Sequence, residues 1–138
     1  MKKIIAITAA LALLLLAAAC GQGGGAADKE IKSGKVGQLT VALANADGVL
    51  RHGEQELDVV FKDASGKGVD VGSASLNFYM PAMGSMAAMN DAATLTTTAT
   101  PGVYRAKLNL QMQGEWQAQV AYEGPAGSGK GSFPVTAQ

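Results

Sequence analysis

The sequence predicts an all-β fold, an immunoglobulin-like antiparallel β-sandwich of about seven strands in residues 38–138. Along several short segments every second residue is apolar, which is the period of a strand with one buried face. Gly, Pro and Asp occur between these segments, where turns are expected. The Cys-Trp-Cys core of antibody domains is missing, because Cys20 is the only cysteine. The pattern therefore indicates the sandwich architecture alone.

The first four predicted strands flank a loop that is rich in methionine. A turn at residues 63–66 follows the second strand, and Pro81 ends the third. The fourth is a weaker, Thr-rich segment at residues 95–98. The predicted inward-facing residues of the first three strands are Leu39, Val41 and Leu43; Leu57, Val59 and Phe61; and Ala74, Leu76, Phe78 and Met80.

The last three predicted strands begin after the Pro101-Gly102 turn. The Gly-rich segment 124–131 nearly spells a phosphate-binding loop, but Gly131 stands where that loop needs Ser or Thr, and no helix follows. We therefore interpret it as a hairpin connection. The inward-facing residues of these strands are Tyr104, Ala106, Leu108, Leu110 and Met112; Trp116, Ala118, Val120 and Tyr122; and Phe133 and Val135.

The N-terminus predicts a lipoprotein signal peptide over residues 1–19. Two lysines precede an apolar run that is shorter than the ~20 residues of a membrane span. The run ends in Ala-Ala-Ala followed by Cys20-Gly21, which resembles a bacterial lipobox. We expect Cys20 to carry acyl chains such as palmitate and to anchor the protein to a bacterial membrane, on its periplasmic or extracellular face. As the only cysteine, Cys20 can form no internal disulfide.

Residues 20–37 predict a lipidated cysteine followed by a flexible tether. Gly, Ala and Lys dominate this stretch, and Ile31 and Val36 are its only large apolar residues. Without residues 1–19 the chain keeps 9 basic and 11 acidic side chains, a formal charge of about −2. We expect no nucleic-acid partner, because phosphate binding needs a clustered basic surface.

Four of the six methionines fall in residues 80–89, with two residues between each and the next. Thioether sulfur is a soft ligand that favours Cu(I) among biological metals. The sequence therefore predicts a copper site on an exposed loop, because Pro81 and Gly84 interrupt regular structure there. The alternative is packing, since methionine also fills core gaps. The predicted ligands are Met83 and Met86, with Met80 as the third sulfur and Met89 as a weaker member.

His52 and Trp116 each allow two interpretations. His52 is the only histidine and precedes the second strand; it is a solvated loop residue unless it lies at the methionine end of the sandwich, where imidazole could complete the copper site. Trp116 has the phase of a core residue, but a tryptophan near Cu(I) could also shield the ion by a cation–π contact. The phase of Met112 predicts a core position. No catalytic arrangement stands out, and we expect no enzyme.

Several of these motifs resemble those of the YtkA-like and FixH-like domains. The most specific are Met-Pro-Ala-Met-Gly at residues 80–84, Pro-Gly-Val-Tyr at residues 101–104 and Met-Gln-Gly-Glu-Trp at residues 112–116. The resemblance implies a small extracytoplasmic β-sandwich associated with heavy-metal efflux or with the assembly of copper-dependent oxidases. Many members carry His where this chain has Ser85, so the resemblance implies either an all-thioether site at Met80, Met83 and Met86 or no metal site.

Three functions fit the sequence. The first is a lipid-anchored protein that binds, passes on or buffers Cu(I) for a membrane partner. The second is an interaction module, in which the methionine loop is a soft apolar contact surface for an efflux or oxidase complex in the membrane. The third is a carrier of a small organic ligand. We expect the first.

Overall fold

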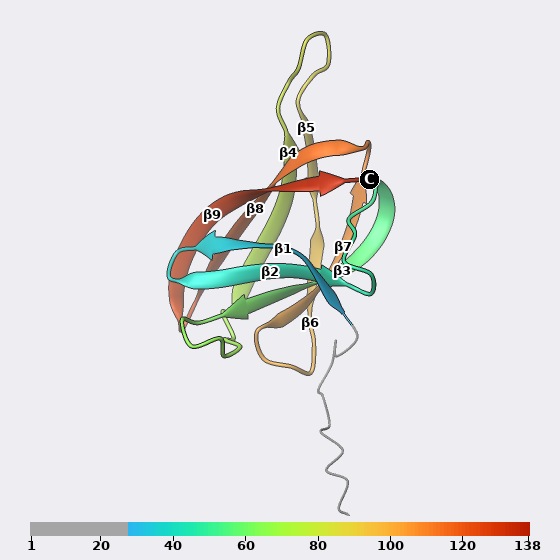
Figure 1. The fold of residues 1–138 in the computed structure, drawn as a ribbon. Helices are drawn as coiled ribbons and strands as arrows, with labels where there is room; N and C mark the ends of the chain where they lie inside the picture. Colours follow the sequence, from blue (N-terminus) through green and yellow to red (C-terminus); the bar gives the residue numbers. More distant parts are fainter. Residues whose placement is uncertain (1–27) are drawn as a thin grey trace, which may run out of the picture.

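Two antiparallel sheets pack face to face in the computed structural model, which describes residues 28–138 (Figure 1). The predicted signal peptide and Cys20 lie outside the described residues. The five-stranded sheet has the order β1 (Lys29–Val36), β2 (Leu39–Asn45), β3 (Gly53–Lys62), β7 (Val103–Leu110) and β6 (Thr94–Thr97). The four-stranded sheet has the order β5 (Met89–Ala92), β4 (Ser73–Met80), β8 (Gly114–Gly124) and β9 (Gly127–Ala137).

The predicted fold class is confirmed, but the described residues form nine strands rather than seven. The alternating residues of β2, β3, β4, β7, β8 and β9 meet between the sheets, as their period of two predicts. The Gly-rich segment is a hairpin, as expected, because Gly124 pairs with Gly127 between β8 and β9. The side chains with less than 2 % exposure include Trp116, Phe61, Phe78, Leu43, Leu50, Leu57, Leu76 and Leu110.

Strand β1 corrects the predicted tether, because residues 29–36 are paired along β2. Only Val36 is fully buried in this strand, so no alternating apolar pattern marks it. Gly34 of this strand allows close packing against β9, because a Cβ at this position would lie 2.6 Å from the ring of Phe133. Strand β1 is therefore held by main-chain pairing and by contact with the other sheet, which composition does not reveal.

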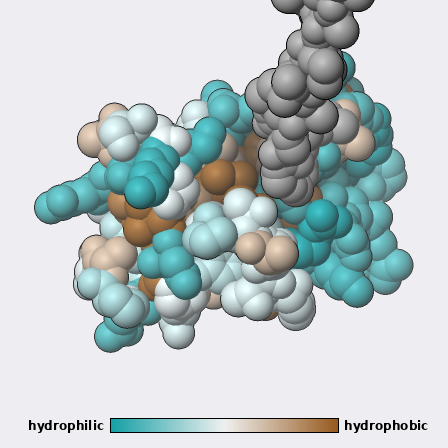
Figure 2. Space-filling model, turned by 90° about the horizontal axis from the view of Figure 1, so that it is seen from below, coloured by the Kyte–Doolittle hydropathy of each residue, from teal (hydrophilic) through white to brown (hydrophobic). Residues whose placement is uncertain are grey.

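Strand β5 is the second strand that the sequence did not predict. It pairs with β4 as the returning arm of a hairpin, and the chain then crosses into the other sheet at Ala93 to form β6 (Figure 1). This hairpin projects beyond the body of the sandwich, at the end away from the start of β1. From the opposite end, hydrophobic residues show only in patches between hydrophilic ones (Figure 2). Within residues 28–138, no helix is long and apolar enough to cross a bilayer.

A candidate metal site at the methionine hairpin

The four clustered methionines form two cross-strand pairs of one hairpin, residues 80–89, which we call the methionine hairpin. Met80 pairs with Met89 where β4 meets β5, and Met83 pairs with Met86 at the tip in the same register. Met83 N–H donates to Met86 O at 3.1 Å, and Met86 N–H donates to Met83 O at 2.8 Å. Directly paired residues place their side chains on the same face, so the thioethers of Met83 and Met86 lie side by side.

Gly84 and Ser85 make the two-residue turn that closes this tip. The φ of Gly84 is 56°, whereas no described residue other than glycine has a positive φ. A positive φ at the first central position alone is the pattern of a type II′ turn, which favours Gly there. The sequence therefore fixes the register that pairs Met83 with Met86.

The two methionine pairs differ in exposure. Met83 is 62 % exposed and Met86 43 %, and they are the only exposed large hydrophobic residues of the described chain. Met80 is 3 % exposed and belongs to the core, whereas Met89 is partly buried against it. The predicted exposed loop is therefore confirmed for the tip pair, while Met80 continues the inward phase of β4.

A pocket of about 290 Å³ lies beside the hairpin and is lined by Met80 and Met83 together with Met112, Gly114 and Glu115. We call it the hairpin pocket. Met112 lies in the turn between β7 and β8 and is partly buried. The predicted core strand through Met112 is wrong in its extent, because β7 ends at Leu110. Sequence reasoning therefore missed Met112 as a neighbour of the methionine hairpin.

His52 lies at the same end of the sandwich as the hairpin pocket but does not line it. Its main-chain N–H donates to Gln138 O at 3.0 Å, and its Nδ1 lies 3.2 Å from the same oxygen. The neighbouring Ala137 pairs with Gly114 of the pocket. A hydrogen bond from Nδ1 leaves Nε2 as the metal-binding nitrogen of the neutral ring. The imidazole is exposed.

Trp116 is a core residue, as its phase predicts. Its side chain is fully buried, and its Nε1–H donates to Met112 O at 3.1 Å. The indole therefore anchors the turn that carries Met112, which is a structural role.

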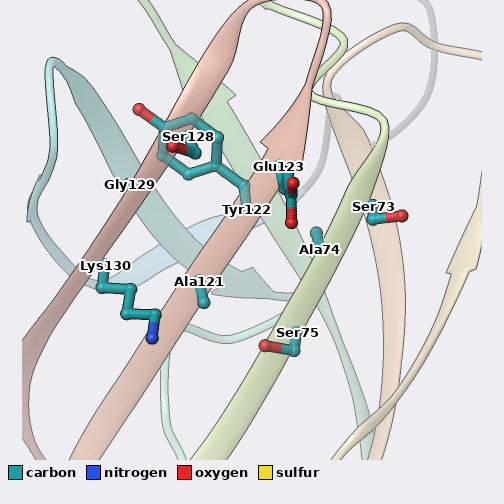
Figure 3. A pocket seen from close by; sticks show the side chains of 9 residues that line it. All are labelled: Ser73, Ala74, Ser75, Ala121, Tyr122, Glu123, Ser128, Gly129 and Lys130. Atoms are coloured by element: carbon teal, nitrogen blue, oxygen red, sulfur yellow. The ribbon is translucent and has the colours of Figure 1, made fainter.

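The larger hollows among residues 28–138 have no methionine in their lining. One of about 550 Å³ lies over β4, β8 and β9 and is lined mainly by short side chains such as Ser75 and Ala121 (Figure 3). Its charged residues are Glu123 and Lys130. No group of three His, Cys, Asp or Glu residues that could hold a metal ion occurs in residues 28–138. The soft sulfur donors of the hairpin are therefore the candidate ligands.

One carboxyl group outside the site is buried. Asp58 of β3 is 5 % exposed and accepts a hydrogen bond from Arg105 Nε at 2.8 Å. Burial raises the pKa of this carboxyl, and so does the side chain of Asp28, against the opposing attraction of Arg105. The group lies on β3 and does not line the hairpin pocket.

Comparison with known proteins identifies the family of the domain. No curated protein and no solved structure matches the chain significantly. A family model described as YtkA-like matches residues 34–121, which include the methionine hairpin, His52 and the turn at Met112. The resemblance to FixH-like domains stays a prediction. Because the matched region is well over half of the 138 residues, the chain belongs to the YtkA-like family.

Proposed function

We propose that the protein is a lipid-anchored, extracytoplasmic binding protein that takes up Cu(I) on the methionine hairpin. It would pass the ion to a protein of the same membrane or buffer it for that protein. The observation that carries this proposal is the cross-strand pairing of Met83 and Met86 at an exposed tip. Two thioethers on one face offer a soft site that Mg²⁺ and Ca²⁺ would ignore.

The position of the tip supports exchange of the ion with a partner. Paired residues have Cβ atoms about 5 Å apart, and the flexible methionine side chain can bring both sulfurs to one ion. Because both side chains are exposed, a partner can approach the ion without opening the core. Neutral sulfur donors without a fixed cage favour reversible binding over permanent storage.

The alternative is an interaction module whose methionines contact a membrane complex without metal. The same exposure favours it, since Met83 and Met86 are the exposed large hydrophobic residues of the described chain. An organic-ligand carrier is less well supported. The hairpin pocket, at about 290 Å³, is just below the usual range of ~300–1,000 Å³, and the larger hollows lack its apolar lining of methionines.

Competition with a chromogenic Cu(I) chelator under anaerobic conditions tests the proposal. The full chain carries Cys20→Ser in every sample, because a free thiolate would itself bind Cu(I). The Met83→Leu/Met86→Leu variant should lose at least tenfold in affinity, about 1.4 kcal/mol. Its fold should survive, since leucine nearly preserves the volume of methionine.

Two variants serve as controls for this measurement. Met89→Leu removes a thioether from the same hairpin without touching the exposed pair, and its affinity should stay close to that of the parent. His52→Ala should have a smaller effect than the double variant, because His52 does not line the hairpin pocket. Equal affinity in parent and double variant would remove the tip from the site. No chelator-competitive uptake at all would leave the interaction module as the better account.

A further inference from the structure

The hairpin pocket joins the methionine hairpin to a second hairpin, the turn between β7 and β8. Met80 and Met83 line it from one side and Met112 from the other. These residues are 32 and 29 positions away from Met112 in sequence, but the pairing of β4 with β8 brings the two hairpins together. The pocket therefore gathers three thioether side chains from two elements.

The end of the Met80 side chain lies next to the turn of Met112. A Cβ on Gly114 would lie 3.2 Å from Met80 Cε, the methyl carbon attached to the sulfur. Gly114 has a φ of 128°, which residues other than glycine rarely adopt. Because Gly114 has no side chain, the Met80 methyl group has space next to it. The thioether of Met80 is thus directed at the β7–β8 turn although the residue counts as core.

The main chain of Met112 is held by the core of the sandwich. Its carbonyl accepts the hydrogen bond of the buried Trp116 indole, which ties the turn to the core. Met80 is packed in the core, at 3 % exposure. Met83, at 62 % exposure, has the most freedom to lose when an ion binds, whereas Met80 is buried and Met112 partly buried. Preorganised donors lower the entropic cost of binding, which favours this set over the tip pair acting alone.

We infer that Met112 is a Cu(I) ligand, and that it forms with Met80 and Met83 a three-sulfur seat in the hairpin pocket. Met86 is then the outward sulfur through which a partner reaches the ion. Met89, the weaker ligand predicted from the sequence, does not line the hairpin pocket and takes no part. This inference rests on the proposed function, which it deepens by naming the inner ligands. The chemistry fits, because three neutral thioethers provide a soft, low-charge environment suited to a monovalent soft ion.

The test follows the methionine methyl groups directly. The full chain with Cys20→Ser is labelled with ¹³C-methyl methionine, and its signals are assigned by single Met→Leu substitutions. Titration with Cu(I) under anaerobic conditions should shift the methyl signals of Met80, Met83 and Met112. The signal of Met89 should stay in place, which makes it the internal control from the same hairpin.

Chelator competition gives an independent measure on matched variants. Met112→Leu should lower Cu(I) affinity at least tenfold, whereas Met89→Leu should change it less than twofold. Thermal unfolding of the metal-free variants checks that both remain folded. The methyl titration itself is run on the parent, and the single variants serve only to assign its signals.

The possible results separate this inference from the proposed function. If the Met83→Leu/Met86→Leu variant loses affinity while Met112→Leu behaves like Met89→Leu, the three-sulfur seat is wrong and copper binding at the tip stands. An unmoved Met112 methyl signal in the Cu(I)-saturated parent would likewise overturn the seat and leave the tip in place. If the parent takes up no Cu(I), both the proposed function and the inference fail.

Discussion

The indole of Trp116 and the main chain of Met112 are joined by a hydrogen bond of 3.1 Å, so a fully buried ring on β8 supports the turn that precedes the strand. Backbone groups at such turns need partners, and an unpaired buried group costs about 1–3 kcal/mol. Trp116 therefore belongs to the core of the sandwich and also holds the turn whose residue Met112 lines the hairpin pocket.

Replacing Trp116 should destabilise the domain strongly. Trp116→Ala should lower the free energy of unfolding by about 3–5 kcal/mol, as truncations of large buried aromatics do. Trp116→Phe keeps an aromatic ring and should cost less, although it removes the donor to Met112. Urea unfolding and thermal melts measure both. An unchanged melting temperature in Trp116→Ala would contradict the buried position.

Asp58 should make stability depend on pH in an unusual direction. Burial first, then Asp28, raise its pKa in the folded state above the ordinary 3.8. A raised carboxyl pKa gives stability that is fully present below the unfolded value and is lost as pH rises through the folded value. Compared with Asp58→Asn, the parent should therefore lose stability as pH increases above about 3.8. Urea unfolding between pH 3.5 and 7 measures this difference.

Asp63 provides a control of opposite sign. The Ser65 hydroxyl, with the main-chain N–H of Lys67, lowers the pKa of Asp63 below 3.8. Its stabilising contribution is present above that value and is lost as pH falls through the folded pKa. Asp63→Asn should thus differ from the parent with a pH dependence opposite in sign to that of Asp58→Asn. Equal trends in the two variants would refute the assignment for Asp58.

Cys20 should be the sole membrane attachment. The apolar run before it is shorter than a bilayer span, and it ends in a lipobox-like motif. Cys20→Ser should therefore move the protein from the membrane fraction to the soluble fraction, as measured by fractionation and blotting. A Ser variant that is processed at the signal site and still sediments with membranes would reveal another anchor.

Most of the fold was predictable because its main strands are buried on one face only. The alternation of β7 and β8 follows directly from that geometry, and so does the core position of Trp116. Strand β1 was not predictable, because it contributes one fully buried side chain and is held by its pairing with β2. Strand β5 was not predictable either, because it is short and lacks a buried apolar face.

The type of ligand in the candidate site was predictable from the sequence, but the set of residues that form the site was less so. The Pro and Gly in residues 80–84 correctly indicated that regular structure is interrupted and that Met83 and Met86 are exposed. Met112 was assigned to the core because its phase continues that of Leu108 and Leu110. The strand ends at Leu110, however, and the turn directs Met112 toward the hairpin. A local pattern does not reveal where two hairpins meet in space.

The methionine hairpin lies at the end of the domain away from the start of β1 (Figure 1). This position affects how Cu(I) would reach an acceptor protein. Seven residues separate Cys20 from Asp28, and a chain of that length reaches at most about 25–30 Å. In an anchored domain the tip would be at the end farther from the anchored start of β1. Its acceptor would have to rise above the lipid headgroups by about the height of the domain. Delivery of the ion would depend on lateral diffusion of the anchored donor and the acceptor in the membrane. Confinement to the membrane surface raises their effective concentration for each other.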